Sequence, residues 1–262
     1  MKLSPFYISR YLIASLFSVS SCAQDSARSP KATVQEYRLA LGASEVKLRK
    51  TTYSTDYSFY FVQLHSNEAT ADQVTQMIAD ESGIEYLQIR NDTERIITFR
   101  SGNKQYRFDP NRIFSNKGIV ETLKLHSTYT ENAFLAVRRF RDSLLNHLDQ
   151  TKTIIAVHNN TEADFSLTHY LESRTGQVYK NSEQDEDDFF ITTDSVLFNQ
   201  LKEKNFNVVL EDGAKITDDG SLSVYCSQKG IPYINVEAEH GHLEEQERML
   251  RALLQVLHGK KP

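Results

Sequence analysis

The chain has 262 residues, 39% of them hydrophobic and 25% charged, a balance typical of a globular protein that can bury a sizeable core. Its formal net charge is −5 and no run of basic residues occurs along it. These features exclude a general nucleic-acid-binding surface, which needs a cationic footprint, so no nucleic-acid partner is expected.

Residues 1–21 have the pattern of a signal peptide. Lys2 and Arg10 precede the apolar run YLIASLFSVS, which is too short to span a bilayer. Ser20 and Ser21 before Cys22 resemble a bacterial lipoprotein signal, which implies cleavage before Cys22 and a lipid on that cysteine. A plain secretory signal that contains a cysteine is the alternative. Both predict a location outside the cytoplasm, and the first predicts anchoring to a bacterial membrane, either at the outer membrane or facing the periplasm.

Residues 22–40 are expected to form the anchor and a tether, because AQDSARSPKAT is polar and rich in small residues. No internal repeat and no second linker follow, so residues 41–262 are expected to form one domain. If Cys22 carries lipid, Cys226 has no disulfide partner. The apolar stretch LSVYC then predicts that Cys226 is a small buried residue and not a nucleophile.

Downstream of the tether, apolar strands alternate with amphipathic helices. Helices are expected over TADQVTQMIADESG with Gly83 at its end, over ENAFLAVRRFRDSLLNHL, from about 195 to 204, and over HLEEQERMLRALLQVL. Strands are expected at YSFYFVQLH, EYLQIRN, TIIAVH, FFITT, NVVLED and IPYINVEAE, with a hairpin that turns at SGN in RIITFRSGNKQYRFD. This alternation predicts a three-layer α/β/α fold with a mixed central sheet.

Polar side chains follow several of these strands at the point where each strand ends. His65 and Glu68 come after YFVQL, and His158 closes TIIAV. The pair Asn111–Arg112 follows the hairpin, and Glu237 lies near the end of the last strand. Ligands gather at the carboxyl ends of strands in open sheets of this kind. We therefore expect these side chains to meet at one site.

The residue types suit metal-assisted hydrolysis. Two imidazoles and one carboxylate can hold a catalytic Zn²⁺ with a fourth position left open. A further carboxylate can accept a proton from water, and an arginine can grip a substrate carboxylate through two hydrogen bonds. Each signal is weak alone, because HxxE pairs arise by chance and a histidine at a strand end is often structural.

Taken in order, LHSNEAT, FDPNRIF, AVHNN and NVEAE resemble the zinc carboxypeptidase superfamily, with its succinylglutamate desuccinylase and aspartoacylase relatives. The resemblance covers residues 57 to 240. It implies that His65, Glu68 and His158 bind zinc, that Asn111 and Arg112 hold the substrate's carboxylate, and that Glu237 is the general base.

The motifs depart from the superfamily in three ways. The gap from Glu68 to His158 is short for a digestive-type carboxypeptidase and nearer to that of the deacylases. The oxyanion arginine has three candidates, Arg95, Arg100 and Arg107, and strand alternation does not choose among them. Glu239 lies two residues after Glu237, on the same face of a regular strand. Glu237 is preferred because it lies further inside the strand.

Three other stretches contain residue types that could serve the site. The acidic stretch 183–188 lacks the spacing and glycine of a calcium loop, so a solvated loop is the simpler interpretation. EHGH (residues 239–242) could bind metal itself, although hydrogen bonding to the ligands or the start of the last helix is favoured. Asp218, Asp219 and Gly220 predict a turn that leads into a helix, with Ser221 as a candidate cap. Either Ser221 or Tyr225 could touch substrate. No GxSxG motif supports a serine hydrolase.

The sequence therefore predicts a lipid-anchored zinc hydrolase that cleaves an amide bond next to a free carboxylate, with peptides or cell-wall peptide fragments as candidate substrates. An N-acyl amino-acid deacylase with the same site is one alternative. A surface lipoprotein that keeps the fold as a binding module without turnover is the other.

Overall fold

The structure is a computed structural model that describes residues 30–259 except 162–164, 174–175 and 214. The predicted signal peptide and Cys22 lie outside the described residues. In chain order the elements are β1 (Thr33–Leu41), β2 (Ser44–Thr52), β3 (Phe59–Gln63), α1 (Ala69–Ser82), β4 (Tyr86–Arg90), β5 (Ile97–Ser101), β6 (Lys104–Phe108), a 3₁₀ helix (Pro110–Arg112), α2 (Asn116–His126), α3 (Glu131–Leu145), β7 (Thr153–Asn160), α4 (Leu167–Ser173), β8 (Gly176–Tyr179), β9 (Phe189–Thr192), α5 (Ser195–Glu203), β10 (Val208–Glu211), α6 (Leu222–Lys229), β11 (Tyr233–Glu239) and α7 (Leu243–Gly259).

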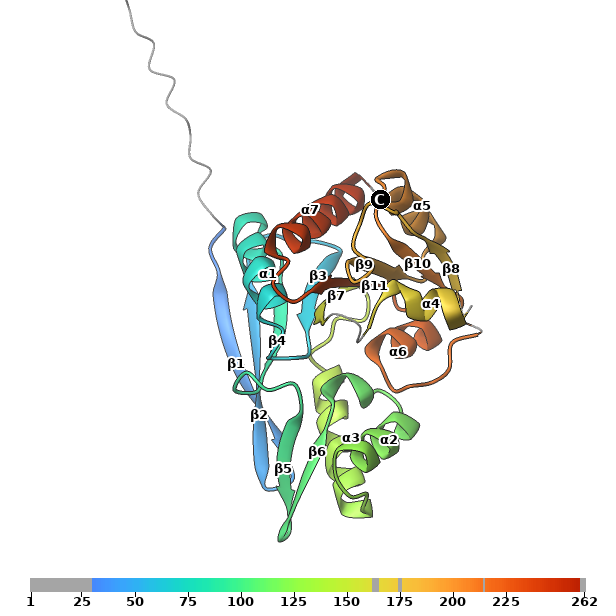
Figure 1. Cartoon of the computed structure of the whole chain (residues 1–262). Helices are drawn as coiled ribbons and strands as arrows, with labels where there is room; N and C mark the ends of the chain where they lie inside the picture. Colours follow the sequence, from blue (N-terminus) through green and yellow to red (C-terminus); the bar gives the residue numbers. More distant parts are fainter. Residues whose placement is uncertain (1–29, 162–164, 174–175, 214, 260–262) are drawn as a thin grey trace, which may run out of the picture.

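The described strands form a nine-stranded sheet in the order β1-β2-β4-β3-β7-β11-β9-β10-β8, and β5 and β6 form a separate hairpin. The central strands β4, β3, β7 and β11 are parallel, whereas β2, β9 and β8 each run antiparallel to a neighbour. Helices cover both faces of the sheet (Figure 1). The predicted three-layer α/β/α fold with a mixed sheet is therefore confirmed.

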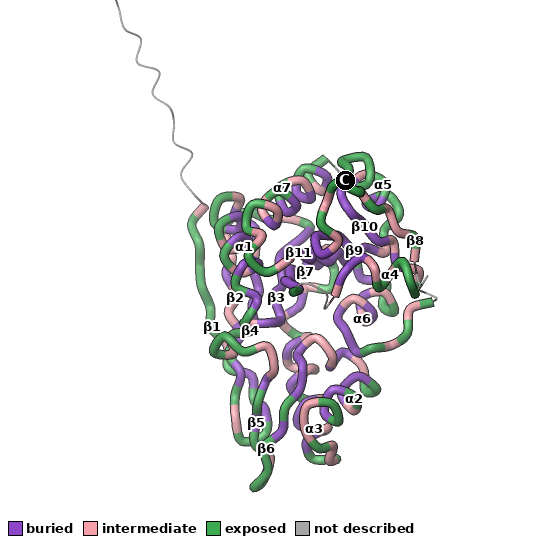
Figure 2. Tube along the Cα trace, viewed as in Figure 1, coloured by how far each residue is buried: buried purple, intermediate pink, exposed green. Residues whose placement is uncertain are grey.

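Alternate residues of the central strands place apolar side chains on both faces of the sheet. In β7, Ile155 and Val157 pack in one cluster with α1, α5 and α7, while Ile154 and Ala156 pack in another with α2, α3, α6 and the hairpin. The central strands are buried along their length, whereas the outermost strand β1 is largely exposed (Figure 2). This double covering explains why TIIAV is a continuous apolar run.

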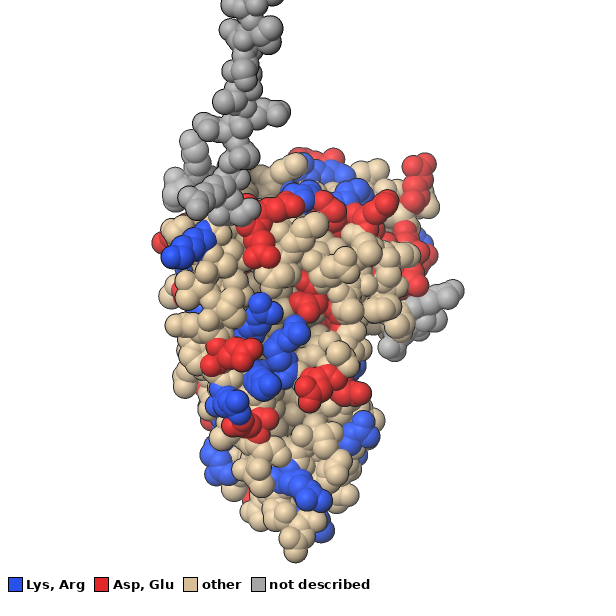
Figure 3. All heavy atoms as spheres, turned by 90° about the vertical axis from the view of Figure 1, so that its left-hand side faces the viewer, with Lys and Arg blue, Asp and Glu red and all other residues tan. Residues whose placement is uncertain are grey.

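The predicted tether over residues 22–40 is too long, because β1 already begins at Thr33 and pairs with β2 along its whole length. Its inward residues are few, since only Leu39 and Leu41 are fully buried. Most of its exposed residues are polar or charged, so the strand looks like a linker in sequence. Basic and acidic side chains are interspersed on the face that carries β1 (Figure 3). Such charges at a sheet edge discourage pairing with other chains.

Several local predictions are confirmed and others need correction. Gly83 ends α1 in the left-handed conformation, with φ at 73°, and Ser221 caps α6 by accepting a hydrogen bond from the Val224 N–H. Cys226 is free and buried, and burial raises the pKa of its thiol to about 12. Five elements were not predicted from the sequence, namely β1, β2, α2, α4 and β8. Among the described residues, no helix combines the length and the apolar character needed to cross a bilayer.

Candidate metal centre and substrate cavity

The site forms where the parallel strands β3, β7 and β11 end at the same edge of the sheet. His158 in β7 is directly opposite Glu237 in β11, because the two strands pair in parallel register. His65 lies two residues beyond the end of β3, which is the other neighbour of β7. The sheet topology therefore brings together three side chains that are far apart in the sequence.

The loop between β3 and α1 is held by hydrogen bonds that leave the Glu68 carboxylate free for the site. The Gln63 side chain donates to the Glu68 carbonyl at 2.9 Å and accepts from the Tyr86 hydroxyl at 2.9 Å. Glu68 is the N-cap residue of α1, yet its side chain makes no capping hydrogen bond. The carboxylate instead turns toward the two histidines.

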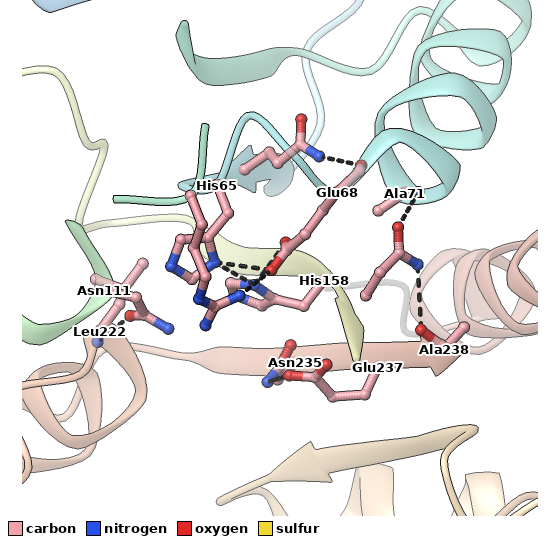
Figure 4. Close-up of polar contacts among 12 residues, drawn as sticks. His65, Glu68, Ala71, Asn111, His158, Leu222, Asn235, Glu237 and Ala238 are labelled. Carbon is pink, nitrogen blue, oxygen red and sulfur yellow. Dashed lines mark hydrogen bonds and ion pairs between the residues drawn. The ribbon is translucent and has the colours of Figure 1, made fainter. Parts of the chain in front are cut away.

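His65, Glu68 and His158 converge at the base of this loop (Figure 4). His65 Nδ1 lies 2.8 Å from Glu68 Oε1, and His158 Nδ1 lies 3.0 Å from Glu68 Oε2. The two Nδ1 atoms are 3.4 Å apart, and one donor atom from each residue lies within 4.8 Å of the others. All three residues are buried.

Asp109 fixes the orientation of His65. Its Oδ1 lies 2.7 Å from His65 Nε2, and because a carboxylate only accepts, Nε2 carries the proton and Nδ1 faces Glu68 and His158. Asp109 was missed in the sequence analysis, although it is the first residue of DPNR. Its position two residues before Asn111 was the available signal.

Arg95 is the candidate oxyanion arginine that lies in the site. Its side chain contacts Glu68 Oε1 at 2.9 Å and Asp109 Oδ2 at 3.3 Å. Arg100 and Arg107 lie on the β5–β6 hairpin, where both are exposed. The structure therefore distinguishes Arg95 from the other two, which alternation along the hairpin could not do.

Opposite charges compensate one another in this buried cluster. Burial alone would lower the pKa of His65, but the carboxylates of Glu68 and Asp109 outweigh burial and raise that pKa to about 9. Burial would likewise raise the pKa of Glu68, but the charges of His65 and His158 hold it well below its usual range. Burial would also raise the pKa of Asp109, but the charges of His65 and Arg95 hold that pKa well below its usual range.

Asn111 and Arg112 lie beside the metal-ligand cluster at the start of α6. Asn111 Oδ1 accepts a hydrogen bond from the Leu222 N–H at 2.9 Å, so its amide NH₂ is directed away from that contact. Arg112 Nη1 donates to the Asn111 carbonyl at 2.9 Å and lies 3.6 Å from Asp219 Oδ2. Both side chains line the same cavity as the two histidines.

Two glycines allow the α6 segment to approach this turn. A Cβ on Gly118 would lie 2.4 Å from the Gly220 Cα, closer than atoms can pack. Gly220 also adopts φ of 78°, a left-handed conformation that glycine tolerates. The close approach is secured by a hydrogen bond from the Phe114 N–H to the Gly220 carbonyl at 2.8 Å.

The cavity has a volume of about 410 Å³, and its walls carry most of the predicted site residues. The predicted residues that line it are His65, Glu68, Arg95, Asn111, Arg112, His158, Ser221 and Glu237. Glu237 is buried beside Asn235, whose NH₂ donates to its Oε1 at 2.8 Å, and burial raises the pKa of Glu237. Glu239 does not line the cavity, and its carboxylate lies 3.3 Å from His242 Nε2.

Tyr225 does not lie with the other predicted residues. Its hydroxyl donates to Gln150 at 3.3 Å and its ring packs near Phe114, outside the cavity. The expected role of Tyr225 in substrate binding therefore finds no support. The phase of α6 is the reason: Ser221, Ser223 and Val224 line the cavity, and residue 225 is directed elsewhere.

The donor set fits a catalytic zinc ion. Two imidazole nitrogens and a carboxylate form the three-ligand set that zinc takes in hydrolases, and they lie together at the wall of a cavity that leaves room for a fourth ligand. Asp109 supplies the hydrogen bond to a ligand histidine that usually accompanies such sites. The predicted ligands therefore fit the metal in number, type and burial.

A second group of side chains that could ligate a metal lies near the start of α7. Asp185, Glu239 and His242 also offer donor atoms within 4.8 Å of one another, but all three are partly or fully exposed. His242 Nδ1 lies 3.1 Å from Asp188 Oδ2, and Asp188 accepts a hydrogen bond from the Glu239 N–H. This network ties the acidic loop to the EHGH segment, so hydrogen bonding accounts for both stretches.

Comparison with known proteins adds fold likeness without a close relative. No family model matches the sequence. No curated protein matches it either. Among solved structures, an aspartoacylase family protein from Mesorhizobium loti shares 12% identity over 87% of this chain and 68% of its own, with a TM-score of 0.45. Murein-tripeptide amidase MpaA from Escherichia coli O157 shares 11% over 90% of this chain and 95% of its own, with a TM-score of 0.41.

The tripeptide-bound cell shape determinant Csd4 from Helicobacter pylori is also similar, with 9% identity over 82% of this chain and 55% of its own and a TM-score of 0.48. At these identities and TM-scores the likeness assigns neither activity nor substrate. The function has to be inferred from the site itself.

Proposed function

We propose that this protein is a zinc-dependent hydrolase that cleaves an amide bond next to a free carboxylate. The observation that carries the proposal is the convergence of His65, Glu68 and His158, whose donor atoms lie within 4.8 Å of one another. These residues share one cavity with a buried carboxylate, Glu237, and with Arg112. A carboxypeptidase-like reaction on peptides, including cell-wall peptide fragments, is the favoured activity.

Each of the other site residues has a role that its position supports. His65, Glu68 and His158 would hold the zinc ion, which would supply Lewis-acid chemistry at a carbonyl and at water. Glu237, as a carboxylate, accepts a proton from the attacking water and passes it to the leaving nitrogen, and burial raises its pKa, which makes the carboxylate a stronger base. Arg95 stabilises the negative charge that develops on the carbonyl oxygen.

Asn111 and Arg112 orient the substrate through its free carboxylate. The arginine offers a planar pair of donors and the Asn111 amide adds another, since its oxygen is already engaged by Leu222. Arg112 is about two-fifths exposed, so it is accessible to a ligand that enters the cavity. This placement directs cleavage to the bond nearest the carboxylate.

The test is a matched pair of substitutions on β11. Glu237→Gln should keep zinc bound but lower kcat by roughly a hundredfold to ten-thousandfold, since it removes the proton acceptor. Glu239→Gln makes the same chemical change outside the cavity and should retain activity. Atomic absorption measures the zinc content, and the release of C-terminal residues from peptides measures turnover. Normal turnover by Glu237→Gln would refute the assigned base.

The same measurements separate the alternatives. Hydrolysis of N-acyl amino acids in preference to peptides would identify the deacylase, which uses the same ligands and the same arginine. Zinc binding without turnover on either class of substrate would favour the non-catalytic binding module. Failure to bind zinc at all would refute both enzymatic proposals.

We also propose that the protein is anchored to a bacterial membrane by a lipid on Cys22. The support is the sequence alone: a short apolar segment, small residues, and then the cysteine. Metabolic labelling with an alkyne fatty acid should tag the wild-type protein and not Cys22→Ser. Label on both variants, or on neither, would contradict this assignment.

A further inference from the structure

The cavity extends away from the zinc ligands to a second end formed by β10, α4 and the first residue of β11. Glu211 from β10, Tyr170 from α4 and Tyr233 from β11 line it there. The Tyr170 hydroxyl donates a hydrogen bond to Glu211 Oε1 at 3.0 Å. Neither Glu211 nor Tyr170 has a role in the chemistry proposed above.

The sheet register fixes where this end lies. Leu210, Thr192 and Ile234 form one row across β10, β9 and β11. Glu211 and Tyr233 are adjacent to that row, so both point to the opposite face, which also carries Glu237. Glu211 lies two strands from β11, roughly 10 Å to the side, and Tyr233 precedes Glu237 by roughly 14 Å along the strand. Glu211 and Glu237 therefore mark opposite ends of the cavity.

Glu211 is a buried carboxylate that pairs with no cation among the described residues. It is only 9% exposed, and within the described part of the chain no lysine or arginine forms an ion pair with it. Burial raises its pKa to about 7, Asp219 adds to the increase, and the Tyr170 hydrogen bond opposes it. A buried carboxylate costs free energy unless it is paired, and a cation that entered the cavity would recover that free energy.

A second observation points to a ligand rich in hydrogen-bond donors. Asn235 is 6% exposed and lines the same cavity, and its Oδ1 has no hydrogen-bond partner among residues 30–259 where they are described. Asn235 follows Tyr233 by two residues on the same face of β11, so it lies between the Glu211 end and Glu237. Ammonium and guanidinium groups carry several N–H donors and no acceptor. Such groups therefore suit a cavity wall that carries an unpartnered acceptor oxygen.

We propose that the Glu211 end of the cavity binds a cationic side chain of the substrate, an ammonium or a guanidinium group. Glu211 is then the specificity-determining residue, with Tyr170 holding its carboxylate in place. The inference rests on the proposed function for the position of the substrate's carboxylate at Arg112. It names the substrate class as peptides or N-acyl amino acids in which a lysine-like or arginine-like residue carries the free carboxylate.

The test compares the binding of L-lysine and L-norleucine to the zinc-loaded protein by calorimetry. The two ligands share the carboxylate and the same carbon chain, but norleucine ends in a methyl group at the carbon that carries the ammonium in lysine. A hydrogen bond to a charged group should make lysine bind roughly tenfold to a hundredfold more tightly. Glu211→Gln should abolish this preference, whereas Glu203→Gln, the same change at an exposed position on α5, should retain it.

Equal binding of the two ligands by the wild type, or binding of neither, would overturn the proposal. A lysine preference that persists in Glu211→Gln would overturn it too. The wild-type comparison decides even if the variant fails to fold. Because the readout is binding, it is independent of turnover: a lysine preference without hydrolysis would refute the proposed enzymatic function while supporting this cationic subsite.

Discussion

Replacing Glu211 by glutamine should remove a pH-dependent loss of stability. The pKa of this carboxyl is about 7 in the folded protein, against an ordinary value of 4.5 that we take for the unfolded chain. As pH rises from 4.5 to 7, the unfolded chain gives up its proton first. The folded state is therefore progressively destabilised through this window, and the penalty is constant above it.

The magnitude follows from the two pKa values. Each pKa unit corresponds to about 1.4 kcal/mol, so the full window is worth about 3 kcal/mol. Between pH 5 and pH 8 the penalty on the wild type should grow by roughly 2 to 3 kcal/mol. Glutamine has nearly the same shape and can still accept the Tyr170 hydrogen bond, but it does not ionise.

The assay is guanidinium unfolding followed by circular dichroism, at several pH values between 5 and 8, with a chelator present to exclude metal. The stability of Glu211→Gln relative to wild type should rise by about 2 to 3 kcal/mol across this range. Other titrating groups cancel in the difference, and Glu203→Gln should show no such rise. A stability difference between Glu211→Gln and wild type that does not change with pH would refute the claim that burial disfavours the ionised form of Glu211.

Three further predictions concern the proposed zinc site. Binding of zinc at pH 7 should release about one proton, because the pKa of His65 near 9 keeps its ring protonated without metal, and zinc affinity should rise with pH up to about 9. Calorimetry in buffers of different ionisation enthalpy measures the proton release, and no release would contradict the prediction. Asp109→Asn should weaken zinc binding by roughly tenfold to a hundredfold in a chelator competition assay, and unchanged affinity would show that its contact with His65 is not needed. Arg112→Lys should raise KM by roughly tenfold while kcat changes little. Arg100→Lys on the exposed hairpin is the control, and an equal rise of KM in the two variants would count against a specific role for Arg112.

The parts of the site that could be predicted from sequence are those fixed by local pattern. His65, His158 and Glu237 each lie at or near the end of a buried apolar strand, and parallel strands present their ends at one edge. Their order along the chain therefore sufficed to place them together. The choice of Glu237 over Glu239 agrees with the cavity, which only Glu237 lines.

The other parts depended on tertiary structure. Arg95 precedes the hairpin in a loop, and only the fold of that loop onto Asp109 distinguishes it from Arg100. Tyr225 was misplaced because the helical phase of α6 follows from its packing on β11. Glu211 was not predicted, because the sheet order that inserts β9 between β11 and β10 is a long-range property.

The most direct test of the central claim is an anomalous-scattering map recorded at the zinc absorption edge from crystals of the zinc-loaded protein. One strong peak should lie within coordinating distance of His65 Nδ1, Glu68 and His158 Nδ1, and it should be absent in His158→Ala. A map without a peak there, or with zinc bound instead at Asp185, Glu239 and His242, would contradict the account.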